Sequence, residues 1–410
     1  MTGSEQVVAE DDLLALADAI DATRMLSDLE SLCAPEFAGR GVGSAGHDLA
    51  TDWLTEKLTD FGLRPEKQVF DIAATFRLTA APVFSVAGPD PATLEHRVDY
   101  AEHPRSGPMP TPAEGVARSL GSAPRAGEWV VLDKVPQGEA FTELAAQVRA
   151  AGGIGLLTPQ NPDGSGFLTK RVMGGKPVDV PVIAVRADLL AQIDGKVVRA
   201  QVQLGRGPVA GTNVVAGIAG TDPDLADRPV LISAHYDGVG ADPERHFQCA
   251  GDNGSGVAVL LEIVRVITER GLALPRPFLF AVLDAEEIGA LGSRHHAGAL
   301  VDAGIRPDVI NVDMAGKFNG AVAAEVGKDT EALISALDRA GRALRIPLAG
   351  GAVASDNRSY AGRDLPAVGL GLGAAHYHSP LDSLDRIDPE ALRMAGRLVV
   401  LSAAYLAQNI

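Results

Sequence analysis

The chain has 410 residues, with 36 Lys and Arg against 53 Asp and Glu, and its formal net charge is −17. This length predicts two or three domains and leaves ample material for a large core. A negative charge of this size repels phosphate backbones and anionic lipid surfaces, so we expect neither nucleic acid nor membrane partners.

The first thirty residues alternate acids with aliphatic side chains and lack a basic stretch followed by an apolar one, so no secretory signal is expected. No apolar run approaches the roughly 18 residues that span a bilayer. These features predict a cytoplasmic protein. Cys33 and Cys249 are too few for a disulfide framework and are expected to be free thiols.

Residues 11–31 predict one amphipathic helix, and a second helix ends at Gly62. From residue 76 to 206, strand-like pieces alternate with turns rich in Pro, Gly and Ser. This stretch predicts a smaller, β-rich α+β domain. It would be inserted into a larger domain made of residues 1–75 and 207–410.

After residue 206 the chain alternates regularly between strands and helices. RPVLISA, RPFLFAVLDA, PDVINVDM and LPAVGLGL are short apolar runs, typical of strands that are buried on both faces. Helical segments such as GVAVLLEIVRVITERG lie between them. The pattern predicts an α/β fold, with a mostly parallel, mixed central sheet flanked by helices.

Histidines and acids follow these predicted strands. His235 follows VLISA, Glu286 and Glu287 follow FLFAVLDA, and Asp313 closes VINVD. Ligands of open α/β sheets bind beyond the carboxyl ends of the strands, so these side chains should meet at one edge. Two further segments, GDNGSG with Asp252 and AHYHSPLD with His378, complete the candidate site.

Imidazole and carboxylate groups suit zinc, and catalytic zinc keeps a position open for water. Two zinc ions carry a charge of +4, which Asp252, Asp313, Glu287 and one hydroxide would balance. The residues therefore favour two zinc ions per chain, and manganese or cobalt could replace them. Asp252 is the best-placed acid to bridge the two ions because it lies on a tight turn.

Two neighbouring positions predict supporting roles. Asp237 lies two residues after His235 and should accept the hydrogen bond of its second ring nitrogen. Glu286 and Glu287 cannot point the same way from an extended backbone. One should bind metal, and the other should act as general base on a water whose pKa zinc lowers toward ~7.

The other histidines and the serines are weaker candidates for catalytic or metal-binding roles. The pair His295 and His296 falls in a predicted helix and is expected to lie on the surface or in the packing. The serines lack the nucleophile-elbow pattern, which disfavours a serine hydrolase. We expect structural roles for five other histidines: His47, His96, His103, His246 and His376.

The motifs AHYDGVG, GDNGSG, AEEIGALGS, NVDMAG and YHSPLD, in this order, resemble those of the co-catalytic zinc aminopeptidase family. That family also contains glutamate carboxypeptidases and glutaminyl cyclases. The resemblance covers residues 30–75 and 207–410 and includes the early FAGRGVGSAG turn. Residues 76–206 resemble the protease-associated domain that some members insert at this point.

The resemblance implies a role for each site residue. His235, Asp252 and Asp313 would bind one zinc ion, and Asp252, Glu287 and His378 the other. Glu286 would be the general base and Asp237 the carboxylate that supports His235, and Tyr377 would polarise the scissile carbonyl. The segment SDNRSYAG departs from the family pattern at Asn357 and after it, which indicates an unusual wall of the substrate pocket.

The expected activity is that of a zinc-dependent exopeptidase, with an aminopeptidase favoured, acting on a peptide or amide substrate. A carboxypeptidase or a dedicated amidase of a small metabolite stays open, because Arg358 could hold a carboxylate. A glutaminyl-cyclase-type cyclotransferase and a non-catalytic, receptor-like binding protein are more distant alternatives. The sequence leaves homo-oligomerisation open.

Overall fold

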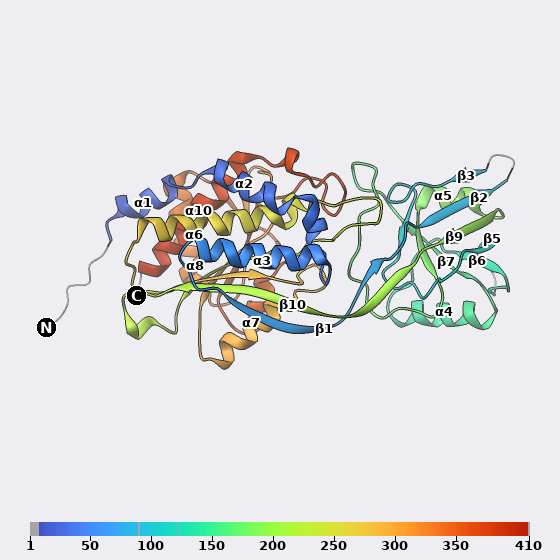
Figure 1. Cartoon of the computed structure of the whole chain (residues 1–410), viewed down its shortest axis with the longest axis horizontal. Helices are drawn as coiled ribbons and strands as arrows, with labels where there is room; N and C mark the ends of the chain where they lie inside the picture. Colours follow the sequence, from blue (N-terminus) through green and yellow to red (C-terminus); the bar gives the residue numbers. More distant parts are fainter. Residues whose placement is uncertain (1–7, 89–90, 122, 409–410) are drawn as a thin grey trace.

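The computed structural model describes residues 8–88, 91–121 and 123–408. Two lobes lie side by side along the long axis of the molecule, each built on its own eight-stranded sheet (Figure 1). We call residues 79–203 the second lobe and the remainder the first lobe. Within these described ranges, no helix combines the length and the apolar character that crossing a membrane requires.

The sheet of the first lobe is mixed, and its central strands are parallel: β12 to β11, β11 to β13, and β13 to β16. In spatial order its strands are β1 (Glu66–Leu78), β10 (Leu204–Ile218), β12 (Phe278–Leu283), β11 (Val230–His235), β13 (Asp308–Val312), β16 (Ala367–Gly371), β14 (Val322–Val326) and β15 (Leu348–Gly350). The predicted fold class is confirmed.

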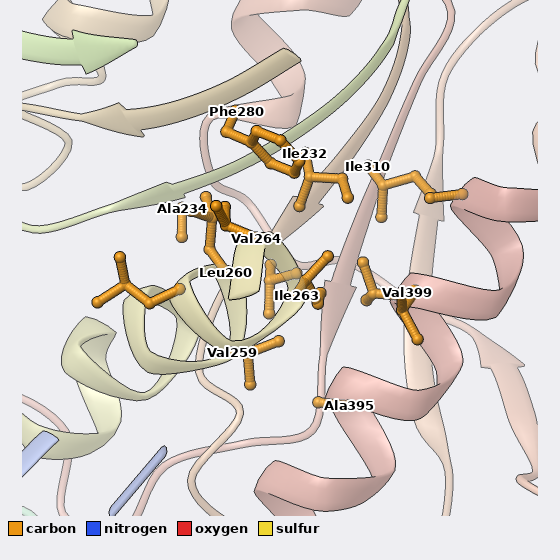
Figure 2. Packing of buried hydrophobic residues seen from close by; sticks show 14 of the residues in the cluster. Ile232, Ala234, Val259, Leu260, Ile263, Val264, Phe280, Ile310, Ala395 and Val399 are labelled. Carbon is orange, nitrogen blue, oxygen red and sulfur yellow. The ribbon is translucent and has the colours of Figure 1, made fainter. Parts of the chain in front are cut away.

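Helices cover both faces of this sheet, and the side chains of its central strands alternate between them. Val230, Ile232 and Ala234 pack toward the helices on one face, whereas Leu231 packs on the other face. Figure 2 shows the first face, where Ile232 and its neighbours meet Leu260 and Val399. Burial on both faces explains why these strands read as continuous apolar runs.

Helices of the first lobe lie on both faces of its sheet. One face carries α6 (Ser255–Arg270) and α10 (Pro389–Gln408), and the other carries α7 (Leu291–Asp302) and α9 (Asn357–Ala361). The other helical segments are α1 (Glu10–Asp18), α2 (Ala22–Leu32), η1 (Pro35–Arg40), α3 (Ala45–Asp60), η2 (Pro223–Leu225), η3 (Ala250–Gly254), α8 (Glu331–Leu344) and η4 (Leu384–Arg386).

The prediction of one helix over residues 11–31 is wrong, because the chain forms α1 and α2 with a break between them. Asp21 has an extended backbone, and its side chain accepts a hydrogen bond from the Thr23 N–H. An aspartate at this position caps the start of a new helix. The apolar spacing continues across the break, which is why the sequence reads as one helix.

The second lobe contains its own sheet, and its described residues also form α4 (Glu139–Ala150) and α5 (Ala187–Ile193). Trp129 is fully buried in its core. In spatial order the strands are β3 (Ala92–Thr93), β2 (Val83–Ala87), β9 (Val197–Gln201), β5 (Ala113–Ser119), β6 (Glu128–Val131), β7 (Gly155–Gln160), β8 (Val182–Arg186) and β4 (Tyr100–Glu102).

Strands β1 and β10 connect the lobes as a long antiparallel ribbon, paired from Glu66 with Val215 to Leu78 with Leu204. The predicted boundaries at residues 76 and 206 fall inside this ribbon. Both strands of the ribbon belong to the sheet of the first lobe. The change in amino-acid composition along the chain therefore does not coincide with the point where one lobe ends and the other begins. The division into a catalytic and an inserted protease-associated domain stays a prediction.

Candidate metal centre

The structure brings the five predicted metal ligands together in two groups. Ligand atoms of His235, Asp252 and Asp313 lie within 4.8 Å of one another, and so do those of Asp252, Glu287 and His378. Asp252 belongs to both groups. All five side chains belong to the first lobe and are largely shielded from solvent.

The fold explains this convergence. His235 is the last residue of β11, Asp313 directly follows β13, and Glu287 follows β12 by a few residues. Because these strands are parallel, their carboxyl ends meet at one edge of the sheet. Asp252 lies in the η3 turn before α6, and His378 lies in the loop after β16.

The distances within the site suit a bridging carboxylate at Asp252. Its Oδ1 lies 3.5 Å from Nε2 of His235, and its Oδ2 lies 3.3 Å from Nε2 of His378. His378 is also 2.8 Å from Oε2 of Glu287, and His235 is 3.6 Å from Oδ1 of Asp313. Each oxygen of Asp252 therefore faces a different histidine.

Four buried atoms of this site have no hydrogen-bond partner among the described residues. They are Nε2 of His235, Oδ1 of Asp313, Oε1 of Glu287 and Nε2 of His378. Buried polar atoms are rarely left unpaired in folded proteins. These nitrogen and oxygen donors are of the kind that zinc prefers, so the residues fit two such ions.

Asp237 supports the site from behind. Its carboxylate lies 3.4 Å from Nδ1 of His235 and accepts the backbone N–H groups of Glu286 (3.0 Å) and Glu287 (3.1 Å). The hydrogen bond of Nδ1 of His235 is with the backbone carbonyl oxygen of Asp237 at 3.2 Å, while the carboxylate lies beside that nitrogen and fixes the turn that carries both glutamates. Contacts of this kind orient metal ligands.

Glu286 and Glu287 share one cavity but differ in their contacts. Both line a cavity of about 490 Å³ beside the centre, and Glu287 also contacts Nε2 of His378 at 2.8 Å. Burial raises the pKa of Glu286 to about 10 and that of Glu287 to about 7. In the absence of metal charge, Glu286 therefore holds a proton that a nearby cation would release.

The two histidines respond to the acids around them. Burial alone would lower the pKa of His378, but the charge of Glu287 raises it to about 10. Burial likewise opposes the charged form of His235, and the charge of Asp313 raises its pKa well above the usual value. For both imidazoles, the negative charge of the neighbouring acids therefore outweighs the effect of burial.

Tyr377 lies at the rim of the same cavity. Its side chain is 48% exposed, and its ring stacks on that of His378 with 3.7 Å between the centroids. Burial of the phenol and the acids around it raise its pKa above the ordinary value. The hydroxyl is therefore a hydrogen-bond donor at neutral pH.

Sequence reasoning missed two residues that hold the Asp252 turn. The carboxylate of Asp382 accepts the backbone N–H groups of Gly251 (2.6 Å) and Asp252 (3.0 Å). The fully buried guanidinium of Arg40 donates to the carbonyl oxygens of Tyr236 (2.7 Å) and Cys249 (2.7 Å). Both lie inside motifs that carry the family resemblance, which was the one available signal.

The structure shows the contacts of four other histidines, whose structural roles stay predictions. His295 stacks on Phe70, and His296 is buried and bonds the hydroxyl of Tyr360. His47 is buried against Asp284. His96 belongs to a cluster of charged side chains between the lobes.

The chain is similar in sequence to known peptidases. The family model "Peptidase family M28" matches residues 213–403. Aminopeptidase YwaD of Bacillus subtilis is 26% identical over 295 residues, 65% of this chain, and the match spans only 60% of YwaD. The probable lipoprotein aminopeptidase LpqL of Mycobacterium tuberculosis is 25% identical, with 94% of this chain and 84% of LpqL covered.

Solved structures share the fold over nearly the whole chain. BSAP, a zinc aminopeptidase from Bacillus subtilis, has a TM-score of 0.73 at 20% identity, with 95% of this chain and 96% of that one covered. A peptidase M28 precursor from Shewanella amazonensis has a TM-score of 0.74 at 20% identity and covers 98% of both chains. Residues 213–403, the part of the chain that matches the M28 family model, carry all five candidate ligands.

Proposed function

We propose that the protein is a zinc-dependent aminopeptidase with two zinc ions per chain. His235, Asp252 and Asp313 would hold one ion, and Asp252, Glu287 and His378 the other. The observation that carries this proposal is Asp252, whose two oxygens face two histidines with unpartnered ring nitrogens. Manganese or cobalt could replace zinc in such a donor set.

The chain's own residues supply the proton chemistry. When bound, zinc ions lower the pKa of water and polarise a carbonyl oxygen. Glu286 takes a proton from the attacking water and returns it to the leaving amine. The hydroxyl of Tyr377 donates to the oxygen of the scissile carbonyl as negative charge develops there. Asp237 keeps His235 and both glutamates in place.

The surroundings of the centre favour recognition of an amine over a carboxylate. Its acids attract a protonated α-amino group. Arg358 lines the cavity, but its guanidinium donates to Glu325 at 2.6 Å, so its charge is already balanced. A carboxypeptidase or amidase, in which Arg358 holds a carboxylate, is the second candidate because this arginine faces the same cavity.

Metal analysis tests the centre itself. Purified protein should contain close to two zinc ions per chain, a chelator should abolish hydrolysis, and added zinc should restore it. Full activity of metal-free protein would overturn the proposed function.

Comparing substrates tests whether the protein recognises the amino or the carboxyl end of a peptide. We expect hydrolysis of a dipeptide with a free amine and little hydrolysis of its N-acetyl form. Preference for the acetylated substrate, together with loss of that activity in Arg358→Ala, would favour the carboxypeptidase. The cytoplasmic location and the state of assembly stay predictions.

A further inference from the structure

A segment of the second lobe reaches the candidate metal centre. Residues 161–180 contain no helix or strand. Within this segment the backbone N–H of Lys170 donates to the carbonyl oxygen of His378 at 2.9 Å. The neighbours of Lys170 line the cavity that contains Glu286: Thr169, Arg171, Val172 and Met173. The segment therefore forms one wall of that cavity.

The wall lies close to the turn that carries Glu286 and Glu287. A β-carbon at Gly289 would lie 3.5 Å from the sulfur of Met173. The backbone of Gly289 has a φ of +113°, which favours glycine. Met173 thus lies against the turn two residues beyond Glu287.

The side chain of Lys170 anchors this wall to the first lobe. Lys170 is only 7% exposed, and its Nζ lies 2.9 Å from both the carbonyl oxygen of Ala241 and Oδ1 of Asp242. Asp242 is buried and also accepts from Nε of Arg97 at 2.7 Å. The ammonium lies 5.0 Å from the ring centroid of Phe247. Both ends of Lys170 therefore bind the first lobe.

Lys170 belongs to a group of charged side chains that we call the interlobe cluster: His96, Arg97, Glu102, Lys170, Asp242 and Glu244. Three of them, His96, Asp242 and Glu244, have ligand atoms within 4.8 Å of one another. Nδ1 of His96 is already bonded to Glu244 at 2.6 Å, however, and Asp242 accepts from Arg97 and Lys170. Each acid of the cluster already contacts a cation or a histidine of the same cluster, so no metal ion is needed to pair them.

We propose that Lys170 is a positioning residue, which fixes residues 169–173 as a wall of the substrate cavity and holds the backbone at His378. Its role in substrate binding rests on the proposed function. A wall that belongs to another lobe keeps its place only through contacts across the interface. Lys170 supplies two such contacts with its side chain and one with its backbone, so losing its charge should release the wall.

The test compares three variants of the zinc-loaded full chain. Lys170→Met removes the charge, Lys170→Arg keeps it, and Lys176→Met changes an exposed lysine of the same segment. With a tripeptide amide as substrate, Lys170→Met should raise KM about 10-fold with kcat within a factor of about 3, since a displaced wall loses binding. Lys170→Arg should restore KM, and Lys176→Met should match the wild type.

Hydrogen exchange gives a readout that does not depend on activity. Lys170→Met should exchange faster in peptides that cover residues 161–180 and 376–380, and Lys170→Arg should not. Unchanged KM or unchanged exchange in Lys170→Met would overturn the proposal. If that variant fails to fold, Lys170→Gln, which keeps a donor for Ala241, takes its place with the same expectations. Absence of hydrolysis by the wild type would contradict the proposed function, while exchange would still test the wall.

Discussion

The interlobe cluster and the candidate metal centre are both groups of largely buried charged side chains, and they differ in how their charges are paired. In the interlobe cluster, Glu102 and Asp242 each contact the guanidinium of Arg97. In the candidate metal centre, the described residues place no Lys or Arg within 4.0 Å of Asp252, Asp313 or Glu287, whose ionic contacts are all with histidines.

This difference separates a cluster that pairs its own charges from a candidate site. A group of charges that neutralises itself stabilises the fold without any ligand. A group that leaves acids and imidazoles facing one another needs protons or metal ions from outside. Burial is common to both, so the imbalance of charge, and not burial, is what indicates a site.

The largest effect is expected in the balanced cluster. Arg97→Met would leave Glu102 and Asp242 without their guanidinium, which should lower the free energy of unfolding by about 3–5 kcal/mol. Denaturant unfolding followed by fluorescence of Trp129, which is buried in the second lobe, measures this. Arg199→Met, at an exposed position, should change stability little. A loss below about 1 kcal/mol in Arg97→Met would break the comparison.

In the unbalanced centre, the corresponding change should affect catalysis and not stability. Glu286→Gln keeps the shape of the side chain but removes the base, so kcat should fall ~100-fold or more with zinc content unchanged. Steady-state kinetics and metal analysis measure the two quantities. Glu287→Gln should lose zinc, and Glu331→Gln, on the surface, should match the wild type. If Glu286→Gln loses zinc and Glu287→Gln does not, the two roles are reversed.

A buried histidine outside both groups sharpens the comparison. His103 has no acid partner among the described residues, and burial, with the charges of Arg171 and Arg105, lowers its pKa to about 4. Its neutral form stabilises the fold fully above pH 6.5, and this contribution is lost as the pH falls toward 4.

At pH 5 the loss relative to pH 7 is about 2 kcal/mol. Denaturant unfolding at the two pH values should therefore show a smaller acid loss in His103→Gln than in the wild type. His246→Gln, at an exposed position, is the control and should lose as much as the wild type. An equal loss in His103→Gln would contradict the pKa shift.

The smallest effect is expected at the rim of the cavity. Tyr377→Phe removes one hydrogen-bond donor from a half-exposed side chain, while the ring that stacks on His378 is kept. We expect kcat to fall on the order of 10-fold, less than for a fully buried oxyanion donor. Zinc content should equal that of the wild type. An unchanged kcat would remove Tyr377 from the proposed chemistry.

The sequence predicted the features that depend on local order along the chain. Strands β11, β12, β13 and β16 could be read from their apolar runs, and the residues that follow them had to meet because parallel strands end at one edge. Their grouping in space agrees with that expectation, although their chemical roles stay predictions.

Other features depend on contacts between distant segments and could not be predicted in this way. Arg40 and Asp382 bind backbone groups of the Asp252 turn. Every residue has such backbone groups, so the amino-acid sequence does not show which of them a distant side chain will bind. Lys170 depends on how the two lobes meet, and it lies in a stretch without periodic spacing. The break between α1 and α2 was hidden because Asp21 reads equally well as part of a helix.

The ribbon of β1 and β10 has a consequence for how such a molecule can change over time. Leu78 and Leu204, where the second lobe leaves and returns, are paired neighbours on adjacent strands. A two-residue turn is enough to close an antiparallel pair at such a point. The whole second lobe therefore occupies the position of a hairpin loop. Its gain, loss or exchange leaves the first sheet in register, so evolution can rebuild the cavity wall while the strands that carry the metal ligands stay unchanged.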